Sequence, residues 1–75
     1  MSADLNSRLA KNLQGLRLKL KISQEDAAAR CRLHRTYLGA IERAERNVTL
    51  STLEQIAKGL QVDPLSLLKR GRVDK

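Results

Sequence analysis

The sequence is poor in aromatic residues: it contains no Phe, no Trp and one Tyr among 75 residues. A hydrophobic core must therefore be built from Leu, Ile, Val and Ala, and of these Leu and Ala are good helix formers. The sequence also lacks runs of the kind that form strands. We expect an all-α fold in a single small domain over residues 1–75, because so short a chain buries only one modest core.

Cysteine is scarce too. The single Cys31 excludes an internal disulfide, and together with His34 it supplies only two of the four ligands of a structural zinc site. Cys31 falls at an apolar position, which predicts a buried side chain and not a nucleophile. The glycines occur singly, without a phosphate-binding loop. We expect no metal, no cofactor, no small-molecule ligand and no enzymatic activity.

Long hydrophobic runs are missing. The start, MSADLNSR, has no apolar signal-peptide core, and no apolar run has the length of a membrane span. We therefore expect a soluble, cytoplasmic protein without a membrane partner.

Acidic residues are outnumbered: 15 Lys and Arg stand against 8 Asp and Glu, giving a net charge of +7 and an isoelectric point near 10.4. This excess favours a polyanion, such as nucleic acid, as partner. A soluble surface with a basic bias is the alternative that composition leaves open.

Apolar residues recur at helical spacing in several segments, which predicts five helices. The first carries leucines at positions 5, 9, 13, 16 and 20. Ser23 is a suitable N-cap for the second, and Leu38 and Ile41 mark a third from Arg35 to about Ala44.

The C-terminal part of the chain predicts the other two helices. An apolar stripe from Leu50 to Leu60 marks the fourth, with Gly59 near its end, and Pro64 begins the fifth. We place this last helix at about residues 63–70 and a frayed tail at residues 71–75.

Two short helices joined by a three-residue turn, over about residues 23–44, are the parts of a helix-turn-helix. From Ile22 to about Leu60 the chain resembles the Cro/C1-type (XRE) DNA-binding domain of lambdoid phage repressors. Gln24 opens the second helix, as in that family, and Ala28 is the small residue at the helix crossing. The family's apolar sites are occupied by Ala27, Cys31, Leu33, Leu38 and Ile41.

The stretch RTYLGAIERAERNVTLSTLE is, more narrowly, similar to the controller proteins of restriction-modification systems, which are small dimeric regulators. The resemblance implies a five-helix, lambda-repressor-like domain that binds double-stranded DNA. Two positions depart from the family pattern. Arg32 occupies the tight turn, where the family has Gly or Asn, and His34 occupies the N-cap of the third helix in place of Ser, Thr or Asp. A left-handed conformation at Arg32 would cost about 1 kcal/mol.

The start of the third helix is the predicted base-reading segment, because the first residues of a recognition helix point into the major groove. Arg35 carries a donor fork suited to guanine O6 and N7, and Thr36 suits a thymine methyl or a phosphate. Gly39 and Ala40 are small and permit close approach, and we include Ala40 among the base-reading residues. An ordinary exposed helix start is the alternative.

Other residues are predicted to contact the DNA backbone. Gln24 lies at the positive end of the second helix, and Tyr37 can donate its hydroxyl to a phosphate. Arg43, Arg46 and Asn47 follow the recognition helix. Each arginine alone has the alternative of a solvated surface charge.

The resemblance also implies a structural ion pair between Arg17 and Glu42 at the edge of the core, where a solvent-exposed pair is the alternative. A further expectation is homodimerisation, because the C-terminal part carries more apolar side chains than a short helix can bury. These apolar residues are Leu60, Val62, Leu65, Leu67 and Leu68, and the predicted interface is formed by Leu60, Val62, Leu65 and Leu68.

A dimeric helix-turn-helix protein reads two half-sites, which predicts a near-palindromic operator. The function predicted from the sequence is that of a transcriptional regulator, with a restriction-modification operon as its target. The alternative is an antitoxin that binds a toxin protein and represses its own operon. The tail of about five residues is too short to wrap around a toxin, so we prefer the transcriptional regulator over the antitoxin.

Overall fold

The computed structural model describes residues 2–69, with side chains from residue 5 onward. This part of the chain contains four α-helices, one short 3-10 helix and no strand, which confirms the all-α fold. The predicted tail at residues 71–75 lies outside the described residues. The elements are α1 (Ser2–Lys19), α2 (Gln24–Cys31), α3 (Arg35–Glu42), α4 (Leu50–Leu60) and the 3-10 helix η1 (Pro64–Leu67).

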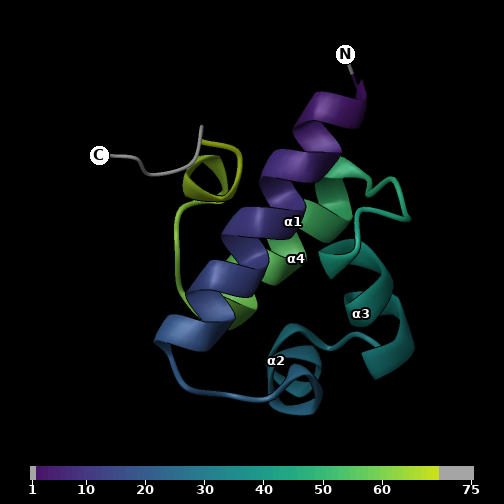
Figure 1. Ribbon diagram of the computed structural model, residues 1–75. Coiled ribbons are helices and arrows are strands. Elements are labelled where there is room, and N and C mark those ends of the chain that lie inside the picture. The colour runs from purple at the N-terminus through teal and green to yellow at the C-terminus, as the bar shows by residue number, and fades with distance from the viewer. Residues whose placement is uncertain (1, 70–75) are drawn as a thin grey trace.

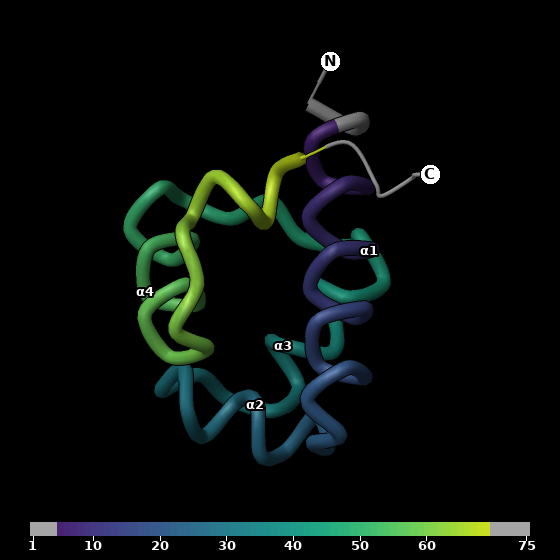
Figure 2. Tube along the Cα trace, turned by 90° about the vertical axis from the view of Figure 1, so that its left-hand side faces the viewer, coloured from purple at the N-terminus to yellow at the C-terminus, as the bar shows by residue number. Residues whose placement is uncertain are grey.

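The helices α2 and α3 are adjacent at one end of the molecule. In Figure 1, α1 crosses in front of α4, α2 lies below them and α3 lies to the side. The view turned by 90° separates α1 from α4 and again places α2 across the end (Figure 2). α2 packs on α3 and α4, and α1 packs on α3, while η1 contacts α1 and α4. The α2–α3 unit is therefore held by two different helices, with α4 packed on α2 and α1 packed on α3.

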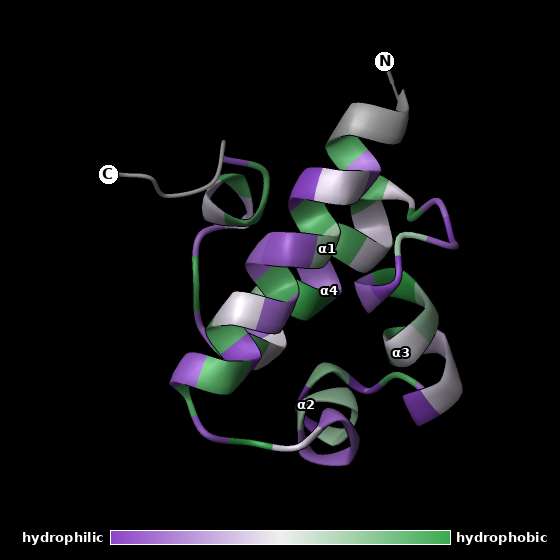
Figure 3. Ribbon diagram, viewed as in Figure 1, coloured by the Kyte–Doolittle hydropathy of each residue, from purple (hydrophilic) through white to green (hydrophobic). Residues whose placement is uncertain are grey.

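The core is aliphatic, as the lack of large aromatic residues requires. Hydrophobic residues form bands between polar ones along the helices (Figure 3), so each helix buries one side. Burying a large aliphatic side chain stabilises a fold by about 1.5–3 kcal/mol. The largest fully buried side chains are Leu13, Leu38, Ile41, Ile56, Leu67 and Cys31.

The predicted apolar stripes are buried in their middle, and several of their end residues are exposed. Leu9 and Leu13 are buried in α1, whereas Leu5 is 47% and Leu20 40% exposed. Leu50, at the start of α4, is 83% exposed although its spacing placed it on the core side. Residues at these helix ends extend beyond the neighbouring helices, whereas Leu60 at the end of α4 is 5% exposed, so helical spacing alone does not decide burial.

Gly59 lies near the end of α4, as predicted, one residue before its last. It lies inside the helix, and a Cβ there would come within 2.5 Å of the Arg30 carbonyl oxygen, so its role is to let α4 approach α2 closely. Residues with positive φ are found after each of the four helices. These four residues, none of them glycine, are Lys21, Arg32, Ala44 and Gln61.

The predicted fifth helix is a single 3-10 turn, not an α-helix reaching residue 70. The Asp63 side chain accepts a hydrogen bond from the backbone N–H of Leu65, and Asn12 of α1 donates to the carbonyls of Leu67 and Lys69, both at 2.8 Å. These side chains satisfy the backbone without further helical hydrogen bonds. One turn is enough to bury Leu67, which is 1% exposed.

Candidate nucleic-acid interface

The turn between α2 and α3 is fixed by local side chains. Ser23 Oγ accepts from the N–H of Asp26 at 3.0 Å and so caps α2, and His34 Nδ1 accepts from the N–H of Thr36 at 3.1 Å and caps α3. Arg32 adopts the left-handed conformation, with φ 59° and ψ 40°. The side-chain amide of Gln55 on α4 donates to the carbonyls of Cys31 and Arg32, at 2.8 and 3.1 Å. The geometry of the turn is thus kept despite both departures from the family pattern.

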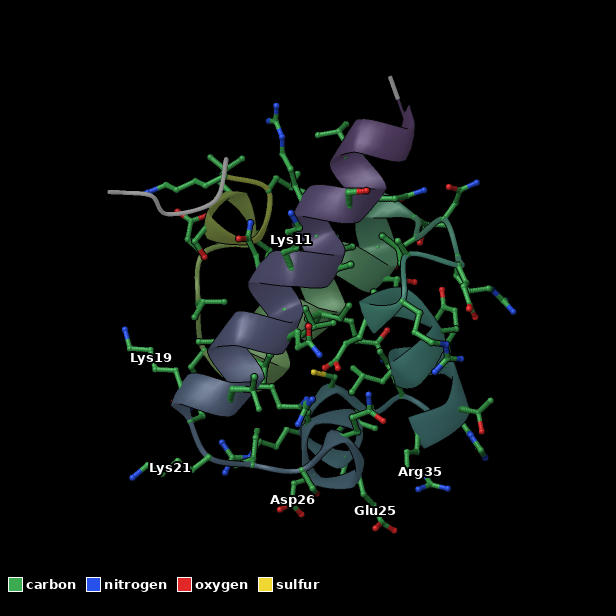
Figure 4. The ribbon with its side chains drawn as sticks, viewed as in Figure 1. Lys11, Lys19, Lys21, Glu25, Asp26 and Arg35 are labelled. Atoms are coloured by element: carbon green, nitrogen blue, oxygen red, sulfur yellow. The ribbon has the colours of Figure 1, made fainter. Side chains whose placement is uncertain are left out.

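The first residues of α3 are open to solvent. Arg35 and Thr36 are exposed, and Arg35 projects from the end of the molecule where the acidic Glu25 and Asp26 of α2 also project (Figure 4). Ala40 is 9% exposed at the edge of the core, and its place among the base-reading residues stays a prediction. Because a helix turns about 100° per residue, Ala40 lies one turn after Thr36 on nearly the same side of α3, closer to the core.

The flank of α3 carries cationic and polar side chains. Tyr37 is half-buried, and the guanidinium carbon of Arg46 lies 5.0 Å from the centroid of its ring, a cation–π distance. Asn47 is exposed, and its side-chain oxygen accepts a hydrogen bond from the amide of Asn6 on α1. Arg43 is exposed and forms an ion pair with Glu45, with 3.1 Å between Nε and Oε1. This loop is therefore ordered by contacts with α1 and α3.

Arg17 and Glu42 form a bidentate pair between α1 and α3. The two hydrogen bonds, Nε to Oε2 and Nη2 to Oε1, measure 2.7 and 3.1 Å. Their side chains are 12% and 2% exposed. The hydrogen bond with Glu42 raises the pKa of Arg17 against the opposing effect of burial. The arginine thus remains charged in a nearly closed site.

This ion pair extends into a network that joins three elements. Arg17 Nη1 donates to the carbonyl of Ile22 at 3.2 Å, which ties down the α1–α2 turn. Gln24 Nε2, from the first residue of α2, donates to Glu42 Oε1 at 2.9 Å. Gln24, predicted to bind a phosphate, thus has its side chain anchored to α3, and its backbone lies at the start of α2.

Cys31 is buried at the end of α2, and its thiol donates to the Ile56 carbonyl at 3.6 Å. Burial raises the pKa of this thiol, which disfavours the nucleophilic thiolate. Among the residues that the structure describes, no group of three metal-ligating side chains is found. Over the same residues, none of the helices combines the length and the apolarity needed to cross a bilayer.

The predicted dimer residues fall into two sets. Leu60 is 5% exposed and belongs to the core of the domain, as does Leu67 at 1%, so Leu60 has little surface to offer a partner. Val62 and Leu68 are half-buried, and Leu65 is 69% exposed. Leu68 also borders an open groove between α1 and the start of α4. The groove is lined by Leu5, Asn6, Leu9, Asn47, Val48, Thr49, Leu50, Leu53 and Leu68.

The sequence did not indicate three residues that contribute to the turn, the loop after α3 and the groove. Asn6 and Gln55 are polar residues of amphipathic helices, and nothing in their spacing indicates the residues that they contact across the fold. Leu50 was assigned to the core. Its place directly after the N-cap Thr49 was the available signal, since first-turn residues often lie beyond the neighbouring helix.

Comparison with known proteins agrees with this geometry. The helix-turn-helix family model matches residues 13–67. The control protein C.SmaI of Serratia marcescens is 48% identical over 67 residues, covering 89% of this chain and 80% of that protein. The control protein C.BamHI of Bacillus amyloliquefaciens is 42% identical over 69 residues, covering 91% of this chain and 85% of that protein.

A solved structure is similar as well. The restriction-modification controller protein C.Esp1396I, determined as a tetramer with its natural 35-base-pair operator, superposes with a TM-score of 0.78 at 40% identity. The match covers 84% of this chain and 83% of that one. The chain therefore belongs to the Cro/C1-type (XRE) helix-turn-helix family, in which it is similar to the restriction-modification controller proteins.

Proposed function

We propose that this protein is a transcriptional regulator that binds double-stranded DNA in a sequence-specific manner. The observation that carries the proposal is the exposed start of α3, with Arg35 and Thr36 free of the core, on an α2–α3 unit braced by α1 and α4. The similarity to a controller protein solved on its operator supports it. The net charge of +7 supplies the attraction to phosphate.

In this proposal, the side chains at the interface have two kinds of role. Arg35 donates to guanine O6 and N7, and Thr36 contacts a thymine methyl or a neighbouring phosphate. Five further residues contact the backbone and set the position of α3 in the groove. They are Gln24, Tyr37, Arg43, Arg46 and Asn47.

We further propose that the chain is a single domain that acts as a homodimer. Its interface would be the apolar end face formed by Leu5, Val48, Leu50 and Leu68, with Leu65 on the neighbouring η1. Leu50 is 83% and Leu65 69% exposed. A contiguous patch of exposed apolar side chains is typical of a protein–protein interface. A dimer with a two-fold axis would read half-sites about 34 Å, or 10 base pairs, apart. Its target would be the operon of a restriction-modification system, by similarity to the controller proteins.

Selection from a library of randomised DNA duplexes tests the proposal. Repeated capture by the purified protein should enrich a near-palindromic sequence, and the enriched duplex should bind at least about a thousand times more tightly than an unselected one. Enrichment of no sequence, with equal binding of all duplexes, would reject sequence-specific regulation. If the enriched site lies upstream of methyltransferase and endonuclease genes in the source genome, the target operon is identified.

A further inference from the structure

The loop after α3 holds a carboxylate among the cations proposed to contact DNA. Glu45 pairs with Arg43 through a single contact of 3.1 Å between Oε1 and Nε. The side chains are 58% and 56% exposed, respectively. The role of Arg43 at the phosphate backbone rests on the proposed function, and Glu45 bears directly on that role.

The Arg43 guanidinium lies back over α3. Its Nη1 is 3.2 Å from the point that a Cβ on Gly39 would occupy, and Gln24 Oε1 is 3.6 Å from the same point. The absence of a side chain at Gly39 is what leaves room there. Arg43 therefore lies where α2 meets α3, near the first residue of α2, and Glu45 contacts the Nε edge of its guanidinium.

The loop backbone keeps Glu45 in place. Ala44 has φ 60°, and the backbone N–H of Glu45 donates to the Ala40 carbonyl at 2.9 Å, which closes the C-terminus of α3. Glu45 is thus part of the capped end of α3 and not of a free loop. Its proximity to Arg43 is a consequence of the fold.

The ion pairs Arg17–Glu42 and Arg43–Glu45 differ in what they can do. Arg17 and Glu42 share two hydrogen bonds in a site where their side chains are 12% and 2% exposed, so their geometry is fixed. Arg43 and Glu45 share one contact in solvent, and exposed pairs of this kind contribute about 0–1 kcal/mol. Such a pair is too weak to hold an arginine in a preset orientation for a phosphate. The remaining effect of Glu45 is its charge, which competes with phosphate for Arg43.

We infer that Glu45 restrains the affinity of this protein for the DNA backbone by competing with phosphate for Arg43. The restraint acts on all sequences alike, because phosphates carry no sequence information. Removing the carboxylate should therefore strengthen specific and non-specific binding by the same factor.

The variant Glu45→Gln removes the charge of the side chain and keeps its shape. Glu54→Gln on the exposed surface of α4 is the matched control, because each variant takes the net charge from +7 to +8. Fluorescence anisotropy would measure binding to a duplex of arbitrary mixed sequence of about 20 base pairs and to the duplex enriched by selection. We expect E45Q to bind both duplexes about two- to fivefold more tightly per protomer, the range that an exposed ion pair represents. The slope of log K against log salt should steepen by about 1 per protomer, and E54Q should change neither quantity.

A double-variant cycle with Arg43→Ala separates competition for Arg43 from a general field effect. In the R43A background the gain from E45Q should disappear. A gain that persists there, a gain equal to that of E54Q, or a loss of affinity in E45Q overturns the inference while leaving the proposed function intact. If the wild-type protein binds no duplex at low salt, the proposed function fails and this inference fails with it.

Discussion

At the scale of single residues, Arg32 adopts a backbone conformation that is unfavourable for a residue with a side chain. It ends α2 with φ 59° and ψ 40°, a region that costs a non-glycine residue about 1 kcal/mol. The fold imposes this conformation because the Leu33 N–H must reach the Ala28 carbonyl, at 2.8 Å, for α3 to begin. Arg32 is therefore a site at which local strain is tolerated for the sake of the turn.

We predict that Arg32→Gly raises the free energy of unfolding by about 0.5–1 kcal/mol, because glycine adopts this conformation without a steric cost. The matched control is Arg30→Gly inside α2, which also removes one exposed arginine and should lower stability by about 1 kcal/mol. Urea denaturation measures both variants. A decrease for Arg32→Gly comparable to that of the control would show that Arg32 is not strained.

Arg35 is the residue on which sequence discrimination should depend. Arg35→Ala should lose about 1–3 kcal/mol per half-site on the selected operator and much less on an unselected duplex, because its bidentate fork is matched to guanine. Arg46→Ala removes the same charge from a proposed backbone contact and should weaken both duplexes alike. Discrimination that survives Arg35→Ala unchanged would remove Arg35 from base reading.

At the scale of elements, the position of α3 relative to α1 depends on a charged contact in the edge of the core. Glu42 accepts three hydrogen bonds, two from Arg17 and one from Gln24. Removing either member of the ion pair leaves a buried charge without its partner, which typically costs about 3–5 kcal/mol.

We therefore predict that Arg17→Ala and Glu42→Ala each destabilise the fold by several kcal/mol, roughly 3–5, and that the double variant loses less than the sum. Operator binding should weaken indirectly, because α3 is then held less firmly against α1. Thermal or urea unfolding of the cycle provides the measurement. The exposed pair Arg43 and Glu45 is the internal control, with an expected coupling under about 1 kcal/mol. Nearly neutral and additive effects at Arg17 and Glu42 would show that the buried pair is not structural.

At the scale of the whole molecule, the exposed leucines separate into two regions. Leu5 and Leu50 border the groove at one end of α1, whereas Leu18, 60% exposed, lies near the other end. Leu18 follows Leu5 by 13 positions, so at 1.5 Å per residue they are about 20 Å apart. This separation allows the proposed dimer face to be tested against an equally apolar site elsewhere.

The double variant Leu50→Ser and Leu65→Ser should shift the protein from dimer to monomer in sedimentation at about micromolar to tens of micromolar concentration, because it removes the two most exposed leucines of the proposed face. Leu18→Ser should leave the dimer unchanged. A wild-type protein that sediments as a monomer, with or without DNA, would contradict homodimerisation.

The salt dependence of binding also belongs to the whole assembly. A dimer that neutralises about eight phosphates should give a slope of log K against log salt near −7. Arg43→Ala or Arg46→Ala should each make the slope shallower by about 1 per protomer. A slope close to zero would argue against backbone contacts of the proposed kind.

The sequence by itself determined the helical class, the α2–α3 unit and the capping residues Ser23 and His34. These features are encoded locally: helical spacing gives the helices, and a cap bonds to a backbone group two or three residues away. The exposure of Arg35 also follows from position alone, because it is the first residue of a short helix whose apolar positions come later.

Only the tertiary structure decided which helix ends are buried and how the last segment ends. Ala40 and Leu60 are in the core, and Leu50 is outside it, because burial depends on what lies across from a residue. The fifth helix stops after one 3-10 turn because Asn12, 55 residues before Leu67, captures its carbonyl. Contacts of this kind join residues far apart in the chain, and no local pattern of residues encodes them.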